Sequence, residues 1–287
     1  MKTYLVNKRC QKCGNIYDPI NSKCPFCKEE NDDKNSSYFH NFIHASVWKE
    51  MAFFLLSIIG LTFFSIIIQL IEKSIFVSQN KNATTAEIAN FLSSLDAISI
   101  ANFTAYFCLF VVMAVLLFKN YKEIVKQIKI KNFLWGLYAF LIILVFTYVY
   151  GLISTLLFKA ANIDQTNNAN ESTIRLMVKA YPVFSIIIFG FIGPLTEETG
   201  YRIGLFSLTS RFGKWIGYIA TALIFAFIHF DWTSFGNTKD LIVELINIPS
   251  YIVAGVILCV AYRKGGFIAS SSAHIANNLL SLLLSLI

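Results

Sequence analysis

The chain has 287 residues, of which 56% are hydrophobic and 14% charged, and its formal net charge is +7. A soluble domain carries about 25% charged residues, and here the apolar residues gather in long runs, which excludes an ordinary soluble protein and indicates a membrane protein. An excess of Lys and Arg in cytoplasmic loops explains the positive charge better than a nucleic-acid partner, so no nucleic acid is expected.

The chain begins with a polar segment that contains two C-x-x-C pairs, Cys10 with Cys13 and Cys24 with Cys27. Two such pairs aim four thiolates at one point, the arrangement that a structural Zn²⁺ prefers, and disulfides are the weaker alternative in a reducing cytoplasm. We predict a zinc ribbon over residues 1–35. A closed four-cysteine site is not catalytic, so the ribbon either binds a protein partner or only caps the N-terminus.

Long apolar runs follow the ribbon, each close to the length of a membrane-spanning helix. Helices are expected because each run then satisfies its own backbone hydrogen bonds. The seven expected spans are Trp48–Ile71, Ala97–Phe118, Leu134–Phe158, Tyr181–Phe206, Trp215–Phe230, Leu241–Tyr262 and Phe267–Ile287. We therefore predict an all-α polytopic membrane protein with about 7–8 transmembrane helices, where the eighth would come from a break at one of the Gly or Pro residues in the last four spans.

The composition divides the chain into three parts. We expect the ribbon in residues 1–35, three transmembrane helices with their loops in 36–180, and a C-terminal membrane core in 181–287. No apolar signal-peptide core precedes the first run, which is expected to act as a signal anchor.

The Lys and Arg residues predict the orientation. With the N-terminus inside, the inner segments hold 17 of them and the outer segments 6, which favours a cytoplasmic N-terminus. We expect an integral protein of a bacterial cell membrane. The basic loop 119–132 is a topology determinant in our interpretation, with contact to anionic lipid as the alternative, and the Asn-rich stretch Ala161–Ser172 is expected to be a loop.

Ionisable and amide side chains inside the last four spans are the main functional signal. A central charged residue costs about 2.5–3.5 kcal/mol on insertion scales, and such residues are by default functional. The candidate site residues are Glu197, Glu198, Arg202, His229, His274 and Asn278.

Helical spacing sorts these side chains. Glu198 and Arg202 are four residues apart and can pair on one face, which leaves Glu197 available as a base. His274 and Asn278 are also four apart and can donate hydrogen bonds to an oxyanion. Taken alone, the Glu198–Arg202 pair could equally be a structural ion pair.

Three short motifs occur in order on successive segments: E-E-x-x-x-R at 197–202, F-x-x-x-H at 225–229 and H-x-x-x-N at 274–278. Together they resemble the CPBP family, which includes CAAX prenyl proteases and bacteriocin-processing or bacteriocin-immunity proteins, also called Abi proteins. The resemblance covers about residues 180–287. It implies hydrolysis of a peptide bond within the membrane, with supporting roles for Glu198 and Arg202.

The resemblance also implies the roles that touch the substrate. Glu197 would be the general base that activates water, His229 would hold that water, and His274 and Asn278 would stabilise the oxyanion. Two histidines and a glutamate could instead hold a catalytic zinc, but the spacing is not H-E-x-x-H, and we favour the glutamate mechanism without a metal. His229 taken alone could be an interfacial histidine.

Several functions remain open on this fold. The expected substrate is a peptide or membrane protein in the lipid bilayer: a CAAX-like protein, a leader peptide or a bacteriocin. The alternative is a non-proteolytic scaffold or immunity protein, which the ribbon motivates as a docking module. A transporter that relays ions through the buried charges is a third hypothesis, although the chain lacks internal repeats.

Overall fold

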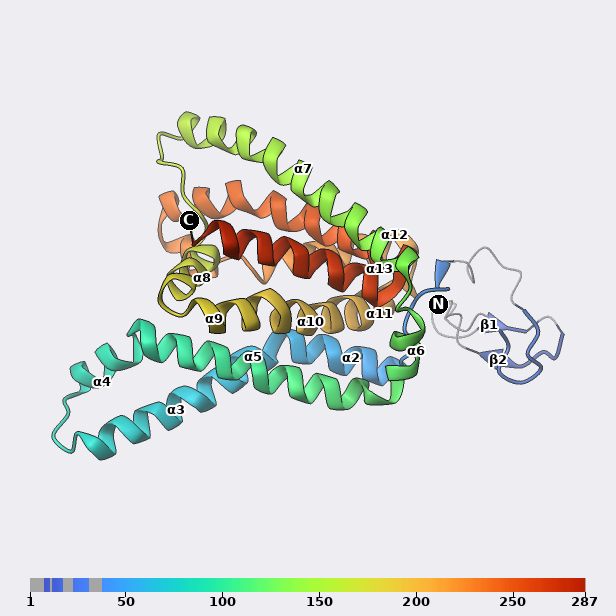
Figure 1. The fold of residues 1–287 in the computed structure, drawn as a ribbon, viewed down its shortest axis with the longest axis horizontal. Coiled ribbons are helices and arrows are strands. Elements are labelled where there is room, and N and C mark those ends of the chain that lie inside the picture. The colour runs from blue at the N-terminus through green and yellow to red at the C-terminus, as the bar shows by residue number, and fades with distance from the viewer. Residues whose placement is uncertain (1–7, 11, 18–22, 31–37, 287) are drawn as a thin grey trace.

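In the computed structural model, the described part of the N-terminal segment forms a small module beside one end of a helical bundle (Figure 1). Its strands β1 (Lys8–Arg9) and β2 (Ile16–Tyr17) pair antiparallel. The structure describes residues 8–10, 12–17, 23–30 and 38–286.

Helices make up nearly all the rest of the described chain. The first half contains α2 (Val47–Leu55), η1 (Leu56–Gly60), α3 (Leu61–Gln79), α4 (Thr85–Leu92), α5 (Leu95–Leu117), η2 (Phe118–Asn120), α6 (Tyr121–Lys126) and α7 (Ile130–Ala160). The second half contains α8 (Ala169–Ala180), α9 (Pro182–Ser185), η3 (Ile186–Ile192), α10 (Gly193–Glu198), η4 (Thr199–Phe206), α11 (Ser207–Ser210), α12 (Lys214–Phe227), η5 (Trp232–Gly236) and α13 (Thr238–Leu284).

Five helical segments of the described chain are long and apolar enough to cross a membrane, and they confirm the predicted all-α membrane fold class. They are Val47–Gln79, Leu95–Lys126, Ile130–Ala160, Pro182–Ser210 and Thr238–Leu284. The last two of the seven expected spans are both present within α13, which counts here as one segment although it turns at Gly266. The expected span Trp215–Phe230 forms α12, whose 14 residues measure about 21 Å, less than the ~30 Å of a hydrocarbon core.

Gly266 divides α13 into two halves that run back beside each other (Figure 1). Its φ of 74° lies in the left-handed region that favours glycine. A Cβ atom at this position would also collide with the side chain of Gln127, whose Oε1 accepts a hydrogen bond from the amide of Phe267 at 2.7 Å. Only glycine fits this turn, and the turn sends the second half of α13 back into the bundle.

The segment 182–210 is the central helix of the bundle, and it is π-helical over η3 and η4. It lies between α13 and the pair α2 and α5 (Figure 1). A Cβ atom on Gly204 would stand 2.8 Å from the backbone nitrogen of Phe54, so this glycine lets α2 approach the backbone of η4. π-Helical turns are frequent at functional sites.

A buried ion pair joins α2 to the end of this central segment. Arg211 donates from Nε and Nη2 to the two carboxylate oxygens of Glu50, at 2.9 and 2.7 Å, and both side chains are almost fully buried. Sequence spacing does not connect these two residues, because they lie far apart in the chain.

The stretch between the ribbon and the first span is part of the core. Phe42 and Ile43 are fully buried, and the amide of Ile43 donates to the hydroxyl of Tyr262 at 3.0 Å. Residues from Tyr38 onward therefore belong structurally to the helical bundle.

Candidate active site

A cavity of about 350 Å³ lies within the bundle. Its walls come from α5, α7, α8, the central segment, α12 and both halves of α13. Four of the six candidate residues line it: Glu197, His229, His274 and Asn278. The other two, Glu198 and Arg202, do not line the cavity.

The two adjacent glutamates lie in different environments. Glu198 is fully buried, and its Oε2 lies 3.2 Å from Nε of the fully buried Arg202. The side chain of Glu197 is 18% exposed, toward the cavity. Successive residues on a helix point about 100° apart, which explains why one carboxylate faces inward to the arginine and the other faces the cavity.

His274 contacts both carboxylates. Its Nδ1 is 3.0 Å from Oε1 of Glu198, and its Nε2 is 3.8 Å from Oε2 of Glu197. A carboxylate at Nδ1 holds a proton on that nitrogen and fixes the orientation of the ring. Nε2 is thereby directed toward Glu197 and the cavity.

The guanidinium of Arg202 is held mainly by its ion pair with Glu198. The Nε–Oε2 contact with Glu198 is an ion pair that lacks the alignment of a hydrogen bond, and within the described residues none of its three nitrogens makes a hydrogen bond. The group lies over the ring of Phe225, 5.2 Å from the centroid. Arg202 therefore balances the buried charge of Glu198, at a distance from the substrate space.

His229 lies just beyond the end of α12. Its Nδ1 is 2.7 Å from the carbonyl oxygen of Phe225, one helical turn earlier, and its ring stacks on Tyr251 with centroids 4.6 Å apart. Nδ1 donates in this contact because a carbonyl only accepts, and Nε2 remains an acceptor. His229 lines the cavity, so it is more than an interfacial side chain.

One hydrogen bond from the side-chain amide of Asn278 fixes its position. Nδ2 donates to the carbonyl oxygen of Phe189 in η3 at 3.0 Å. An amide nitrogen carries two hydrogens, so the second remains for a group in the cavity.

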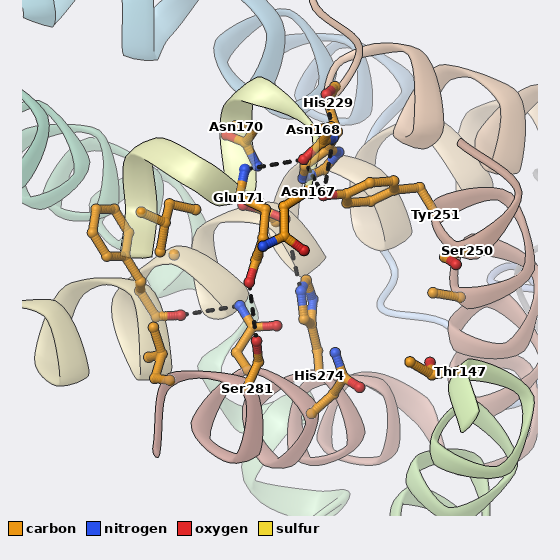
Figure 2. Close-up of a pocket in the computed structure, with 18 of the residues that line it drawn as sticks. Thr147, Asn167, Asn168, Asn170, Glu171, His229, Ser250, Tyr251, His274 and Ser281 are labelled. Atoms are coloured by element: carbon orange, nitrogen blue, oxygen red, sulfur yellow. Dashed lines mark hydrogen bonds and ion pairs between the residues drawn. The ribbon is translucent and has the colours of Figure 1, made fainter. Parts of the chain in front are cut away.

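Helix α8 forms one wall of the cavity, although its first residues were expected to be a loop. Asn168 caps its N-terminus by accepting from the amide of Glu171 at 3.0 Å, and Arg175 pairs with Glu171 at 2.9 Å. Figure 2 shows Asn168 and Glu171 facing the same cavity as His274. The Asn-x-x-Glu capping pattern and the i,i+4 pair were the signals that could have revealed this helix.

The four N-terminal cysteines come together as the sequence predicted. Their sulfur atoms all lie within 4.8 Å of one another, and the pairs Cys10–Cys27 and Cys13–Cys24 are 3.5 Å apart. Sulfurs bound to one zinc at about 2.3 Å would stand about 3.8 Å apart, so the donor set fits a metal ion such as zinc.

The C-terminal part of the chain is similar to one known family. Residues 179–280 match the family described as type II CAAX prenyl endopeptidase Rce1-like. This Rce1-like region contains all three motifs and the four cavity-lining candidates, so the resemblance inferred from the motifs is confirmed. With the apolar helices, it supports an integral membrane protein of the CAAX-type intramembrane protease class.

The Rce1-like region includes the central segment, α12 and α13, and it leaves the ribbon and the helices α2 to α7 outside the match. No curated protein and no solved structure shows a significant match to the chain.

Proposed function

We propose that this protein is an intramembrane endopeptidase that hydrolyses a peptide bond with a water molecule activated by Glu197. The main support is the difference between the two glutamates. Glu198 is fully buried against Arg202 and His274, whereas Glu197 faces the cavity with a partly exposed carboxylate. A base that must reach water and substrate needs that exposure.

The attacking water would lie between Glu197 and His229. Glu197 takes one proton from the water. Nε2 of His229 accepts a hydrogen bond from the other O–H group of the water and thereby orients its oxygen. The bond from Nδ1 of His229 to Phe225 and the stacking on Tyr251 keep the imidazole in that orientation. The resulting hydroxide adds to the carbonyl carbon of the scissile bond.

The tetrahedral oxyanion would be stabilised by His274 and the free amide hydrogen of Asn278. The donor on His274 would be Nε2, because Nδ1 already faces Glu198. Collapse of the intermediate breaks the C–N bond, and the proton taken by Glu197 passes to the leaving amine.

We favour this mechanism over one that uses a catalytic metal. Bound zinc would polarise the carbonyl and activate water, with Glu197, His229 and His274 as its ligands. Among the described residues, the group of possible metal ligands whose ligand atoms lie within 4.8 Å of one another is the four cysteines. The ligand atoms of Glu197, His229 and His274 are not gathered as closely. The contact of 3.8 Å between Glu197 and His274 suits an ion pair.

The substrate is proposed to be a peptide or a membrane protein that reaches the cavity within the bilayer. CAAX-like proteins, leader peptides and bacteriocins are the classes that the family resemblance suggests. The Lys and Arg distribution supports a cytoplasmic N-terminus, and we propose a bacterial cell membrane as the location.

The N-terminal module is proposed to be a structural zinc ribbon in residues 1–35, separate from helices in 36–180 and the catalytic core in 181–287. A deletion of residues 1–35 is a suitable test, because it stops before the buried stretch that starts at Tyr38. If the ribbon only docks a partner or caps the chain, purified protein without it keeps its peptidase activity.

The proposal is tested by mapping new protein termini across the proteome in cells that express wild type or Glu197→Gln at matched levels. Termini found only with wild type would support a peptidase and identify its substrates. The exposed variant Asp240→Asn is the matched control and should give the wild-type set. Identical termini for wild type and Glu197→Gln, with both proteins folded and abundant, would contradict the proposal and favour a non-proteolytic scaffold.

A further inference from the structure

Glu244 is a buried carboxylate outside the three motifs. It is 4% exposed and lies in the first half of α13. Its Oε1 accepts from the amide of Ala169 at 3.1 Å, and its Oε2 accepts from the amide of Asp231 at 3.2 Å. One side chain therefore joins the first turn of α8 to the chain two residues after His229.

A second contact joins the same two segments. Nδ2 of Asn168 donates to the carbonyl oxygen of His229 at 3.2 Å and lies 3.3 Å from the hydroxyl of Tyr251. Tyr251 is seven residues after Glu244, on the same face of α13, and stacks on the His229 ring. Figure 2 shows Asn168, His229 and Tyr251 close together at the edge of the cavity.

The chemistry of this contact requires a carboxylate. Both partners of Glu244 are backbone N–H donors, so both oxygens must accept, and a glutamine offers only one acceptor. Burying a carboxylate is costly, but the negative charge at the first turn of α8 satisfies an unpaired amide and complements the helix dipole. A residue needed only for packing would be apolar at this position.

We propose that Glu244 is a positioning residue for His229: its carboxylate fixes the segment after α12 against α8, so that the imidazole stays aimed at the cavity. This inference rests on the proposed peptidase function, in which His229 orients the water. Small displacements of such a group cost about 100-fold in rate.

The first test is a double-mutant cycle on a peptide that spans a junction cleaved by wild type. Glu244→Ala should lower kcat about 100-fold in the wild-type background, and Glu244→Gln should lower it less. In a His229→Ala background, Glu244→Ala should change the remaining rate by less than about twofold, because its effect passes through His229. Asp240→Asn, one turn earlier and exposed, is the control and should match wild type. An equal loss in both backgrounds would overturn the inference.

The second test needs no substrate. The variant Ala169→Cys with Asp231→Cys places one cysteine at each of the two residues whose backbone amides donate to Glu244. After mild oxidation, the peptide that contains the disulfide between these two cysteines is quantified by mass spectrometry. Cross-linking should be fast with Glu244 present and at least about tenfold slower with Glu244→Ala. An unchanged rate would overturn the inference. If wild type cleaves no peptide, the proposed function fails, and the cross-linking rate still decides whether Glu244 fixes the two segments.

Discussion

Removal of Arg202 is expected to destabilise the protein strongly. The Arg202→Met variant leaves the carboxylate of Glu198 fully buried without the arginine that pairs with it, and His274 remains in contact with that carboxylate. Breaking a buried pair by removing one partner costs about 3–5 kcal/mol. For a chain of this size 1 kcal/mol shifts the unfolding midpoint by about 2–4 °C, so we expect a decrease on the order of 10 °C.

The assay is thermal unfolding in detergent, followed by tryptophan fluorescence. The double variant Arg202→Met with Glu198→Gln removes both charges and should recover most of the lost stability. Arg175→Met is a matched control: its i,i+4 pair with Glu171 is partly exposed, and such pairs contribute about 1 kcal/mol or less. A midpoint for Arg202→Met within about 2 °C of wild type, or a double variant as unstable as the single one, would refute the reasoning.

Three further predictions concern other parts of the structure. Arg211→Met should cost about 3–5 kcal/mol in a urea or thermal titration, because it removes the guanidinium that binds both carboxylate oxygens of the buried Glu50, and adding Glu50→Gln should restore most of the lost stability. No effect of the single change would contradict the assignment. Gly266→Ala should destabilise the protein by more than about 1 kcal/mol in the same measurement. Adding Gln127→Ala should restore only part of the lost stability, because it removes the collision with the new Cβ atom but leaves the positive φ. Full recovery of stability would show that backbone strain is unimportant. Cys24→Ser should reduce the metal content measured by elemental analysis from one ion per chain to near zero, and an unchanged content would argue against the four-cysteine site.

Much of the fold and the placement of the candidate site followed from local patterns. Runs of about 20 apolar residues identify spans regardless of context, and spacing of four residues predicted the pairing of Glu198 with Arg202. The C-x-x-C pairs predicted the cysteine cluster because each pair closes its own turn. The Rce1-like match confirms the family resemblance, whereas the catalytic roles of individual residues remain proposals.

The features that the sequence did not reveal depend on contacts between distant segments. Glu244 looks like an ordinary residue near a helix start, and its meaning appears only when α8 and the end of α12 meet it. The same holds for Glu50 and Arg211. The close approach of Gly200 and Gly204 in η4 to α2 and η1 is likewise a contact between distant segments, and hydropathy cannot distinguish π-helical from α-helical turns.

The most direct measurement of the central claim is hydrolysis of a mapped substrate peptide by purified protein in lipid vesicles. Wild type should cleave it, and Glu197→Gln should be slower by about 10²–10⁴-fold with the same unfolding midpoint. Cleavage by Glu197→Gln at the wild-type rate would contradict the role of Glu197 as the base that activates water.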